Sequence, residues 1–125
     1  MARLALTPQV TLGGYPAIPL VANSADFTWT LSGADFADGA GFPLTGRELL
    51  LVRNDNAGAQ TITIDAVADK FRRGAANWIA TYSIGIGEYA VFGPFPPTGW
   101  RQADGQLYFD VTAADLSFAV IRIPA

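Results

Sequence analysis

The segment RELLLVRNDNAGAQTITI, residues 47–64, decides the fold class. In an extended chain its first part places Leu49 and Leu51 on one side and Leu50 and Val52 on the other. Apolar side chains on both sides are typical of a strand that is covered on both faces. We therefore predict that RELLLVR forms a central strand of a β-sheet.

The rest of this segment predicts a turn and a second strand. Residues 54–58, NDNAG, carry side chains that tolerate left-handed backbone and bond their own main chain. Residues 60–64, QTITI, alternate threonine with isoleucine, which is the pattern of a half-buried strand. We predict that residues 47–53 and 60–64 form a β-hairpin.

Further strands are expected along the rest of the chain, which has 13 Gly and 8 Pro spread so that long helices are disfavoured. Their spacing of about ten residues is typical of a sandwich or jelly roll. The fold class predicted is all-β, with a single β-sandwich or jelly-roll-like domain. The expected strands are residues 26–31, 78–84, 88–92, 106–111 and 117–123.

Two connections are also predicted. Residues 32–46, rich in Gly and Asp, are expected to form a loop before the central strand. Asp104-Gly105 is a strong signal for a two-residue hairpin. It would pair residues 100–102 with residues 106–109 and place Trp100 near a sheet margin.

The N-terminal part of the chain has a different pattern. Three prolines interrupt residues 1–22, which have neither helical nor two-residue periodicity. We predict an extended N-terminal arm, residues 1–25, followed by the sandwich domain, residues 26–125. Such an arm cannot bury its side chains against itself, so it must lie along its own domain or a neighbour. Its candidate contact residues are Leu4, Leu6, Val10, Leu12, Tyr15, Ile18 and Leu20.

Composition excludes several functions. The 125 residues include eight basic and eleven acidic side chains, with no histidine and no cysteine. This excludes Ser-His-Asp and Cys-His nucleophiles and thiolate zinc sites. There is no basic patch for nucleic acid, no apolar run that could span a membrane, and no signal-peptide core before Pro8. We expect a chain that is not exported and binds neither nucleic acid nor membrane.

Hydrophobic residues are unusually frequent. They make up 50% of the chain and charged residues only 15%, against about 25% charged in a typical soluble domain. Monomers seldom leave large apolar patches in water. We expect another protein surface to cover the surplus.

Carboxylates are the remaining candidates for catalysis or metal binding. Glu48 and Glu88 open predicted strands, and a structural role is favoured for them over a glycosidase pair. Asp35 and Asp38 begin like a calcium loop, but Gly46 stands where the twelfth-position glutamate is required. We predict no catalytic residue, no metal, no cofactor and no small-molecule substrate.

The segment FGPFPPTGW, residues 92–100, combines three prolines with three aromatic side chains. A stiff apolar loop loses little freedom on docking, so its candidate contact residues are Phe95, Pro96, Pro97 and Trp100. The alternative is a loop that caps the open end of the sandwich. Trp78 and Trp100, with neighbouring tyrosines, offer another reading, a carbohydrate-binding module. For Trp78 and Tyr82, burial in a core or interface is favoured.

Four stretches together resemble small structural proteins of tailed-bacteriophage virions. They are FPLTGRELLLVRN (residues 42–54), QTITI (60–64), FGPF (92–95) and FAVIR (118–122). The match covers roughly residues 36–123 and leaves out the N-terminal arm. It implies a capsid decoration or cement protein: a β-sandwich that clamps neighbouring coat subunits, often as a trimer.

The resemblance also implies partners and a location. The expected partner is the major capsid protein or another virion protein, and the chain is expected to form a homo-oligomer, a trimer. It would be synthesised in the cytoplasm of the bacterial host and reside on the capsid surface of the virion. A tail or connector component remains an alternative, as does the carbohydrate-binding module.

Overall fold

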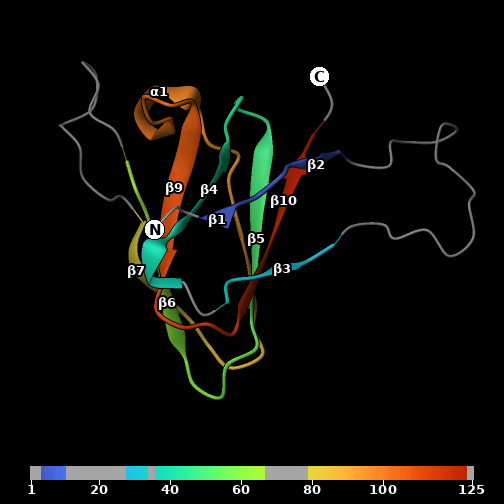
Figure 1. Ribbon diagram of the computed structural model, residues 1–125, viewed down its shortest axis with the longest axis vertical. Helices are drawn as coiled ribbons and strands as arrows, with labels where there is room; N and C mark the ends of the chain where they lie inside the picture. Colours follow the sequence, from blue (N-terminus) through green and yellow to red (C-terminus); the bar gives the residue numbers. More distant parts are fainter. Residues whose placement is uncertain (1–3, 11–27, 34–35, 67–78, 124–125) are drawn as a thin grey trace, which may run out of the picture.

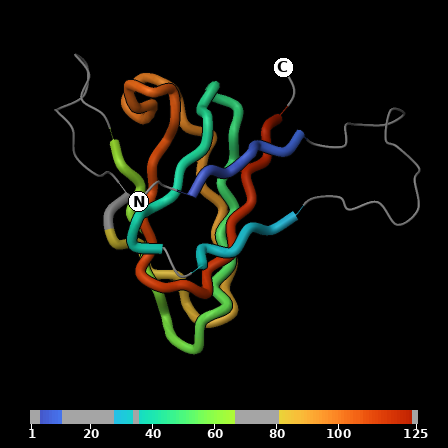
Figure 2. Tube along the Cα trace, in the orientation of Figure 1, coloured from blue at the N-terminus to red at the C-terminus, as the bar shows by residue number. Residues whose placement is uncertain are grey.

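The protein was analysed as a computed structural model, which describes residues 4–10, 28–33, 36–66 and 79–123. These residues form two β-sheets that pack face to face (Figures 1 and 2). The predicted all-β sandwich is therefore confirmed. Apart from strands, the described residues contain a 3-10 turn, η1 (Phe36–Asp38), and a single turn, α1 (Pro97–Trp100).

Each sheet combines strands from distant parts of the chain. Sheet A contains, in spatial order, β1 (Leu4–Ala5), β4 (Ala40–Pro43), β9 (Gln106–Val111), β6 (Gln60–Ile64) and β7 (Ile79–Ile84). Sheet B contains, in spatial order, β2 (Gln9–Val10), β10 (Leu116–Arg122), β5 (Glu48–Asn54) and β8 (Tyr89–Phe92). In addition, β3 (Thr30–Leu31) pairs with β10 beside β2.

The core lies between the two sheets. It is built from inward-facing side chains of β5, β6, β9 and β10. Eight of these side chains are at most 1% exposed: Leu50, Val52, Ile62, Ile64, Leu107, Phe109, Phe118 and Val120. The rings of Phe109 in sheet A and Phe118 in sheet B meet edge to face, with centroids 4.9 Å apart. This contact joins the sheets at their centre.

The six strands predicted between residues 47 and 123 form with ends that differ by one residue or less over the described residues. The strand predicted at residues 26–31 is shorter, because residues 28 and 29 are not in a strand and only Thr30–Leu31 form β3. The sequence did not predict β1, β2 or β4.

The strand predicted from RELLLVR is central, because β5 lies between β10 and β8. Its two-sided apolar pattern has the expected cause on the inner side, where Leu50 and Val52 are fully buried. On the other side of the strand, Leu49 and Leu51 are partly buried.

The predicted hairpin between β5 and β6 is wrong. The two strands belong to different sheets: β5 pairs with β10 and β8, and β6 pairs with β9 and β7. The reason is the fully buried Asn54, whose Nδ2 donates to the carbonyl oxygens of Ile84 (2.8 Å), Gly85 (3.1 Å) and Gly58 (3.1 Å). Residues 54–58 therefore connect a strand of sheet B to a strand of sheet A, and do not form a hairpin turn within one sheet.

Two other connections differ from the expectation. Within the predicted loop of residues 32–46, β4 pairs with β9, and the backbones approach so closely that a Cβ on Gly41 would lie 3.0 Å from the Leu107 oxygen. The Asp104-Gly105 turn forms, closed by the bond from the Gly105 N–H to the Gln102 oxygen (2.9 Å). Its first arm is not a strand at Trp100, because the prolines favour the α1 turn there.

Residues 4–10 lie along the chain's own domain, one of the two placements expected for the arm. They cross from sheet A to sheet B, as the blue segment of Figure 2 shows, with β1 parallel to β4 and β2 parallel to β10. Leu6, between these strands, is 5% exposed and belongs to the core. The rest of the predicted arm lies outside the described residues.

Within the described residues there is no helix whose length and hydrophobicity would let it span a membrane.

Candidate functional site

The outer surface of sheet A is polar. Its outward side chains alternate with the buried core residues and include Thr61, Thr63, Ser83, Tyr108 and Asp110. Inward apolar and outward polar residues are the ordinary pattern for an antiparallel sheet with one face in water. Among the described residues, the outer side of sheet A thus has the composition of a sheet surface in contact with water.

The outer surface of sheet B is apolar. We define the sheet B face as the outward side chains of its three longest strands other than Ser117: Leu49, Leu51 and Arg53 of β5, Tyr89 and Val91 of β8, and Ala119 and Ile121 of β10. Leu51 sits between Ala119 on one neighbouring strand and Val91 on the other, so an apolar row crosses the sheet. Tyr89 and Val91 are 66% and 62% exposed, whereas Ala119 is 1% exposed. The other members of the face, Leu49, Leu51, Arg53 and Ile121, are partly buried.

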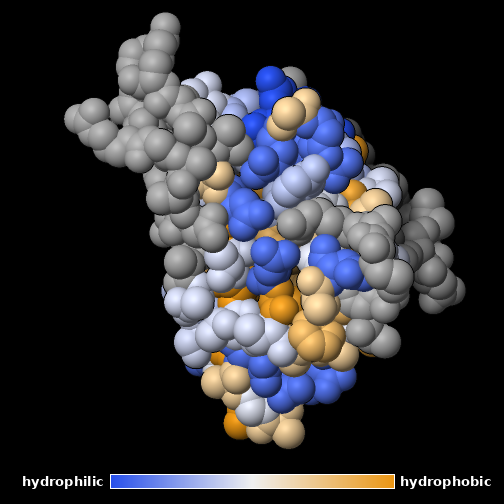
Figure 3. Space-filling view, turned by 60° about the vertical axis from the view of Figure 1, so that its left-hand side comes forward, coloured by the Kyte–Doolittle hydropathy of each residue, from blue (hydrophilic) through white to orange (hydrophobic). Residues whose placement is uncertain are grey.

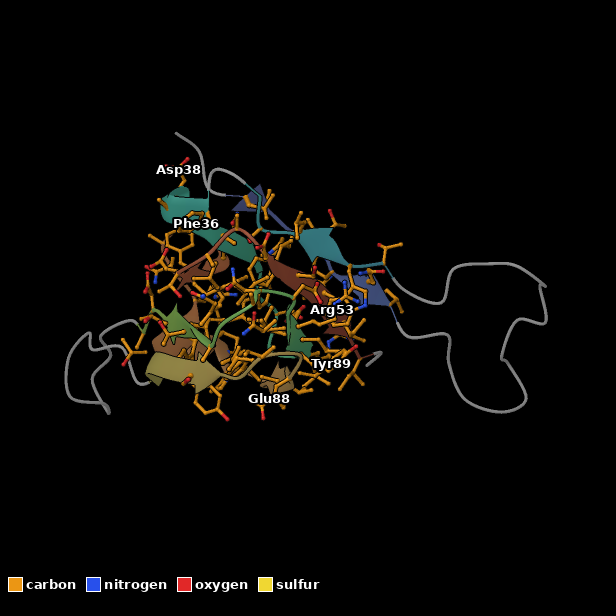
Figure 4. All side chains as sticks on the ribbon, turned by 90° about the horizontal axis from the view of Figure 1, so that it is seen from below. Phe36, Asp38, Arg53, Glu88 and Tyr89 are labelled. Atoms are coloured by element: carbon orange, nitrogen blue, oxygen red, sulfur yellow. The ribbon has the colours of Figure 1, made fainter. Side chains whose placement is uncertain are left out.

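Two residues of this face, Arg53 and Tyr89, form an aromatic and cationic cluster with Trp29. The Arg53 guanidinium lies 4.8 Å from the centroid of the Trp29 ring, and this ring meets Tyr89 edge to face at 6.1 Å. Arg53 Nε also donates to Asp55 Oδ2 at 3.0 Å. Figure 4 shows Arg53 and Tyr89 on the same side of the molecule. Tryptophan, tyrosine and arginine are the side chains that most often dominate the energetics of protein interfaces.

Glu48 is a fully buried carboxylate. Its Oε1 accepts hydrogen bonds from the N–H groups of Thr45 (2.8 Å), Gly46 (3.1 Å) and Arg47 (3.2 Å). Its Oε2 accepts from the Thr45 hydroxyl (2.8 Å) and from Arg122 Nε (2.5 Å). Burial raises the pKa of Glu48, but these hydrogen bonds and the Arg122 charge outweigh it and lower the pKa to about 2.

The contacts of Glu48 define what it does. They tie the turn before β5 to Arg122 at the end of β10, and so fix the register of the two central strands of sheet B. Glu88 is tied in a similar way, since its Oε1 accepts from the Gly85 N–H at 2.6 Å. Both carboxylates that sequence analysis weighed as catalytic candidates thus hold the main chain.

The structure removes three residues from the predicted contact set. Leu6, Phe95 and Trp100 are 5%, 3% and 7% exposed and belong to the chain's own core. The Phe95 and Trp100 rings pack with centroids 5.0 Å apart, so residues 92–100 cap the sandwich, the alternative reading of that loop. Burying two large rings removes more apolar surface from water than holding them in an exposed loop.

The other predicted contact residues fall in three groups. Val10 and Pro96 are exposed. Leu4 and Pro97 are partly buried, with Leu4 packed against the core. Outside the described residues lie Leu12, Tyr15, Ile18 and Leu20.

The structure gives no support to the aromatic platform for sugars. Trp100 is buried and presents no ring face, and Trp78 lies outside the described residues. Tyr82 is exposed, but its ring meets Phe92 edge to face at 5.5 Å instead of forming a flat platform.

Sequence analysis missed the sheet B face as a site. The signal was present in the two-sided apolar pattern of RELLLVR and in the alternation of Tyr89 and Val91 with Ala90 and Phe92. The same pattern is expected of a strand that is buried on both faces inside the fold. The order of strands, which decides that this side of the sheet faces outward, is not written in any local stretch.

The described residues thus offer a surface and not a cavity. Figure 3 brings forward the side that lies to the left in Figure 1, where β6, β7 and β9 of sheet A lie, and shows hydrophobic residues near the middle and at the lower tip between hydrophilic ones. Among the described residues there is no pocket and no group of three metal-ligating side chains. No protein-family model matches the chain, and no curated protein or solved structure shows significant similarity to it.

Proposed function

We propose that this protein is a non-enzymatic structural component of a bacteriophage virion, a decoration or cement protein that binds neighbouring coat subunits of the head. One observation carries the proposal: the sheet B face is apolar where a solvated sheet is polar, as sheet A is. A rigid sandwich with one apolar outer face is suited to bind another protein surface.

The chemistry of this face fits binding by burial. Fully burying an exposed valine side chain contributes about 1.5–3 kcal/mol, and Val91, which is 62% exposed, can contribute part of this when a partner covers it. Lost rotational freedom and side-chain ordering oppose this gain in a single contact. On a symmetric shell the same contact repeats, and repetition converts a modest affinity into a stable attachment.

The resemblance to virion proteins supports the same conclusion. Two of its stretches, residues 42–54 and 118–122, include β5 and most of β10, the central strands of sheet B. Part of the resemblance therefore falls on strands that build the proposed binding face, while residues 60–64 are β6 of sheet A. The expected partner is the major capsid protein.

Imaging of particles tests this function directly. We expect cryo-electron microscopy of virions carrying a C-terminally tagged copy, labelled with gold particles against the tag, to show label at regularly repeated positions over the head. The reason is that a cement protein occupies every equivalent site of the shell. Label confined to the tail or connector, or purified particles without the protein, would contradict the assignment.

A further inference from the structure

We propose that β8 pairs with β8 of a second copy of this chain, antiparallel and about a two-fold axis at Ala90, so that the two B sheets become one continuous sheet. The inference concerns self-association in solution. It goes beyond the proposed function and does not depend on it.

Among the described residues, the edge of sheet B at β8 is open. β8 is the last strand of the sheet, and within the described residues no strand pairs with its outer side. In an antiparallel pair of strands, hydrogen-bonded and non-hydrogen-bonded residue pairs alternate. The hydrogen bond from the Asn54 N–H to the Glu88 oxygen (3.0 Å) identifies which residues of β8 bond to β5. It follows that Ala90 and Phe92 bond to β5, while Tyr89 and Val91 direct their N–H and C=O groups toward the open edge.

Apart from its short length of four residues, this edge strand lacks the features by which proteins protect exposed strands. Such edges usually carry a charge, a proline or a bulge. The neighbouring edge of sheet A has one of these, because the β6–β7 register shifts between Ile62 and Ile64 and Thr81 has φ 50°. In contrast, β8 has the sequence YAVF and regular pairing with β5.

Apolar side chains gather at the same edge. Of the large hydrophobic residues described as exposed, four lie on β7, on β8 or in the turn between them: Tyr82, Ile86, Tyr89 and Val91. The nearby carboxylate of Glu88 is held in its own turn by the Gly85 N–H. A second strand can therefore approach β8 without meeting a free charge in the residues that pair.

Self-pairing fits one register. With Ala90 on the two-fold axis, Tyr89 and Val91 form hydrogen-bonded pairs with the partner's Val91 and the partner's Tyr89, which satisfies all four outward backbone groups of the strand. Aromatic and β-branched residues opposite each other are a favourable cross-strand pair. Ala90 then faces its own copy at a narrow pair, where Cα atoms lie about 4.5 Å apart and a small side chain fits.

The second copy is also favoured by continuity with the sheet B face. In this register the row of Leu51 and Val91 continues through the partner's Tyr89 and reaches the partner's Arg53. The dimer would present one apolar face of twice the width. A two-fold pair, and not the trimer implied by the resemblance, is then the unit that binds other proteins.

Sedimentation of two variants at Val91 tests the pairing on the full chain. Val91→Pro removes an N–H that points to the open edge and leaves the bonds to β5 in place, a position where edge strands accept proline. We expect dimers for the unaltered chain, at least about tenfold weaker dimerisation for Val91→Pro, and retained dimers for the matched control Val91→Thr. Melting curves of all three establish that they are folded.

Cross-linking gives a second readout that does not depend on proline. The chain has no cysteine, so Ala90→Cys introduces a single thiol at the two-fold axis. A Cα separation of about 4.5 Å there is within the range that a disulfide spans. We expect oxidation to give a covalent dimer with Ala90→Cys and not with Ser83→Cys on β7.

A monomeric or trimeric unaltered chain would overturn the pairing, as would a dimer in which Ala90→Cys does not cross-link. Any of these results leaves the proposed function standing, because that function is tested on particles. The converse also holds, since a dimer in solution does not establish attachment to a virion.

Discussion

Glu48→Gln is expected to lower the free energy of unfolding by about 3 kcal/mol, because it breaks a buried ion pair from one side only. An amide presents one oxygen and one NH₂ group. In one orientation of the glutamine amide, its NH₂ group faces the three N–H donors of residues 45–47. In the other orientation, the NH₂ group faces the Thr45 hydroxyl and Arg122. Donors then meet donors in a site that water does not reach.

The matched control is Glu88→Gln. Glu88 is exposed, and its carboxylate accepts one main-chain N–H in the β7–β8 turn. We expect this substitution to cost less than about 1 kcal/mol, as is usual at the surface. Urea unfolding of both variants measures the difference, and equal small losses would show that Glu48 does not fix the two central strands.

The same carboxylate makes stability depend on pH in acid. In the unfolded chain Glu48 titrates near 4.5, and in the folded protein its pKa is about 2. The folded state therefore keeps the charge while the unfolded state takes up a proton, so the contribution of about 3 kcal/mol is complete above pH 5 and is lost as the pH falls toward 2. We expect the free energy of unfolding of Glu48→Gln to change less between pH 5 and pH 2 than that of the unaltered protein.

The strands could be predicted from sequence because their pattern is local. The two-sided apolar run of RELLLVR marks a central strand, and in the structure β5 has a neighbour on each side. Strand ends follow from glycine, proline and Asp-Gly signals, which act within a few residues. Local chemistry therefore fixes where the chain is extended.

Sheet membership could not be predicted, because it rests on contacts between distant residues. NDNAG looks like a hairpin turn, yet the Asn54 side chain bonds to Ile84, thirty positions further along the chain. In the same way β4 is a poor strand by composition and forms because Gly41 lets β9 come close. The candidate site inherits this limit, since β8 becomes an edge only through the order of the strands.

Leu51→Lys is expected to abolish attachment to the shell with little effect on the fold. Leu51 lies at the centre of the sheet B face, between Ala119 and Val91, and points away from the core. An ammonium group at this position would have to leave water without an opposite charge when a partner covers the face. A loss of more than 1.4 kcal/mol at each contact weakens binding more than tenfold.

The matched control for this variant is Ser83→Lys. Ser83 is exposed on β7 and lies on the polar outer surface of sheet A, so it receives the same charge on the opposite side of the sandwich. We expect its attachment to equal that of the unaltered protein. Melting temperatures of both variants within a few degrees of the unaltered protein would confirm that binding, and not folding, is compared.

Counting copies on purified virions by quantitative mass spectrometry decides whether the sheet B face is the binding surface. We expect the unaltered protein and Ser83→Lys at equal occupancy and Leu51→Lys at no more than about one tenth of it. Particles that carry Leu51→Lys at full occupancy would contradict the central claim, because an apolar face that accepts a buried charge without loss is not the surface that holds the protein in place.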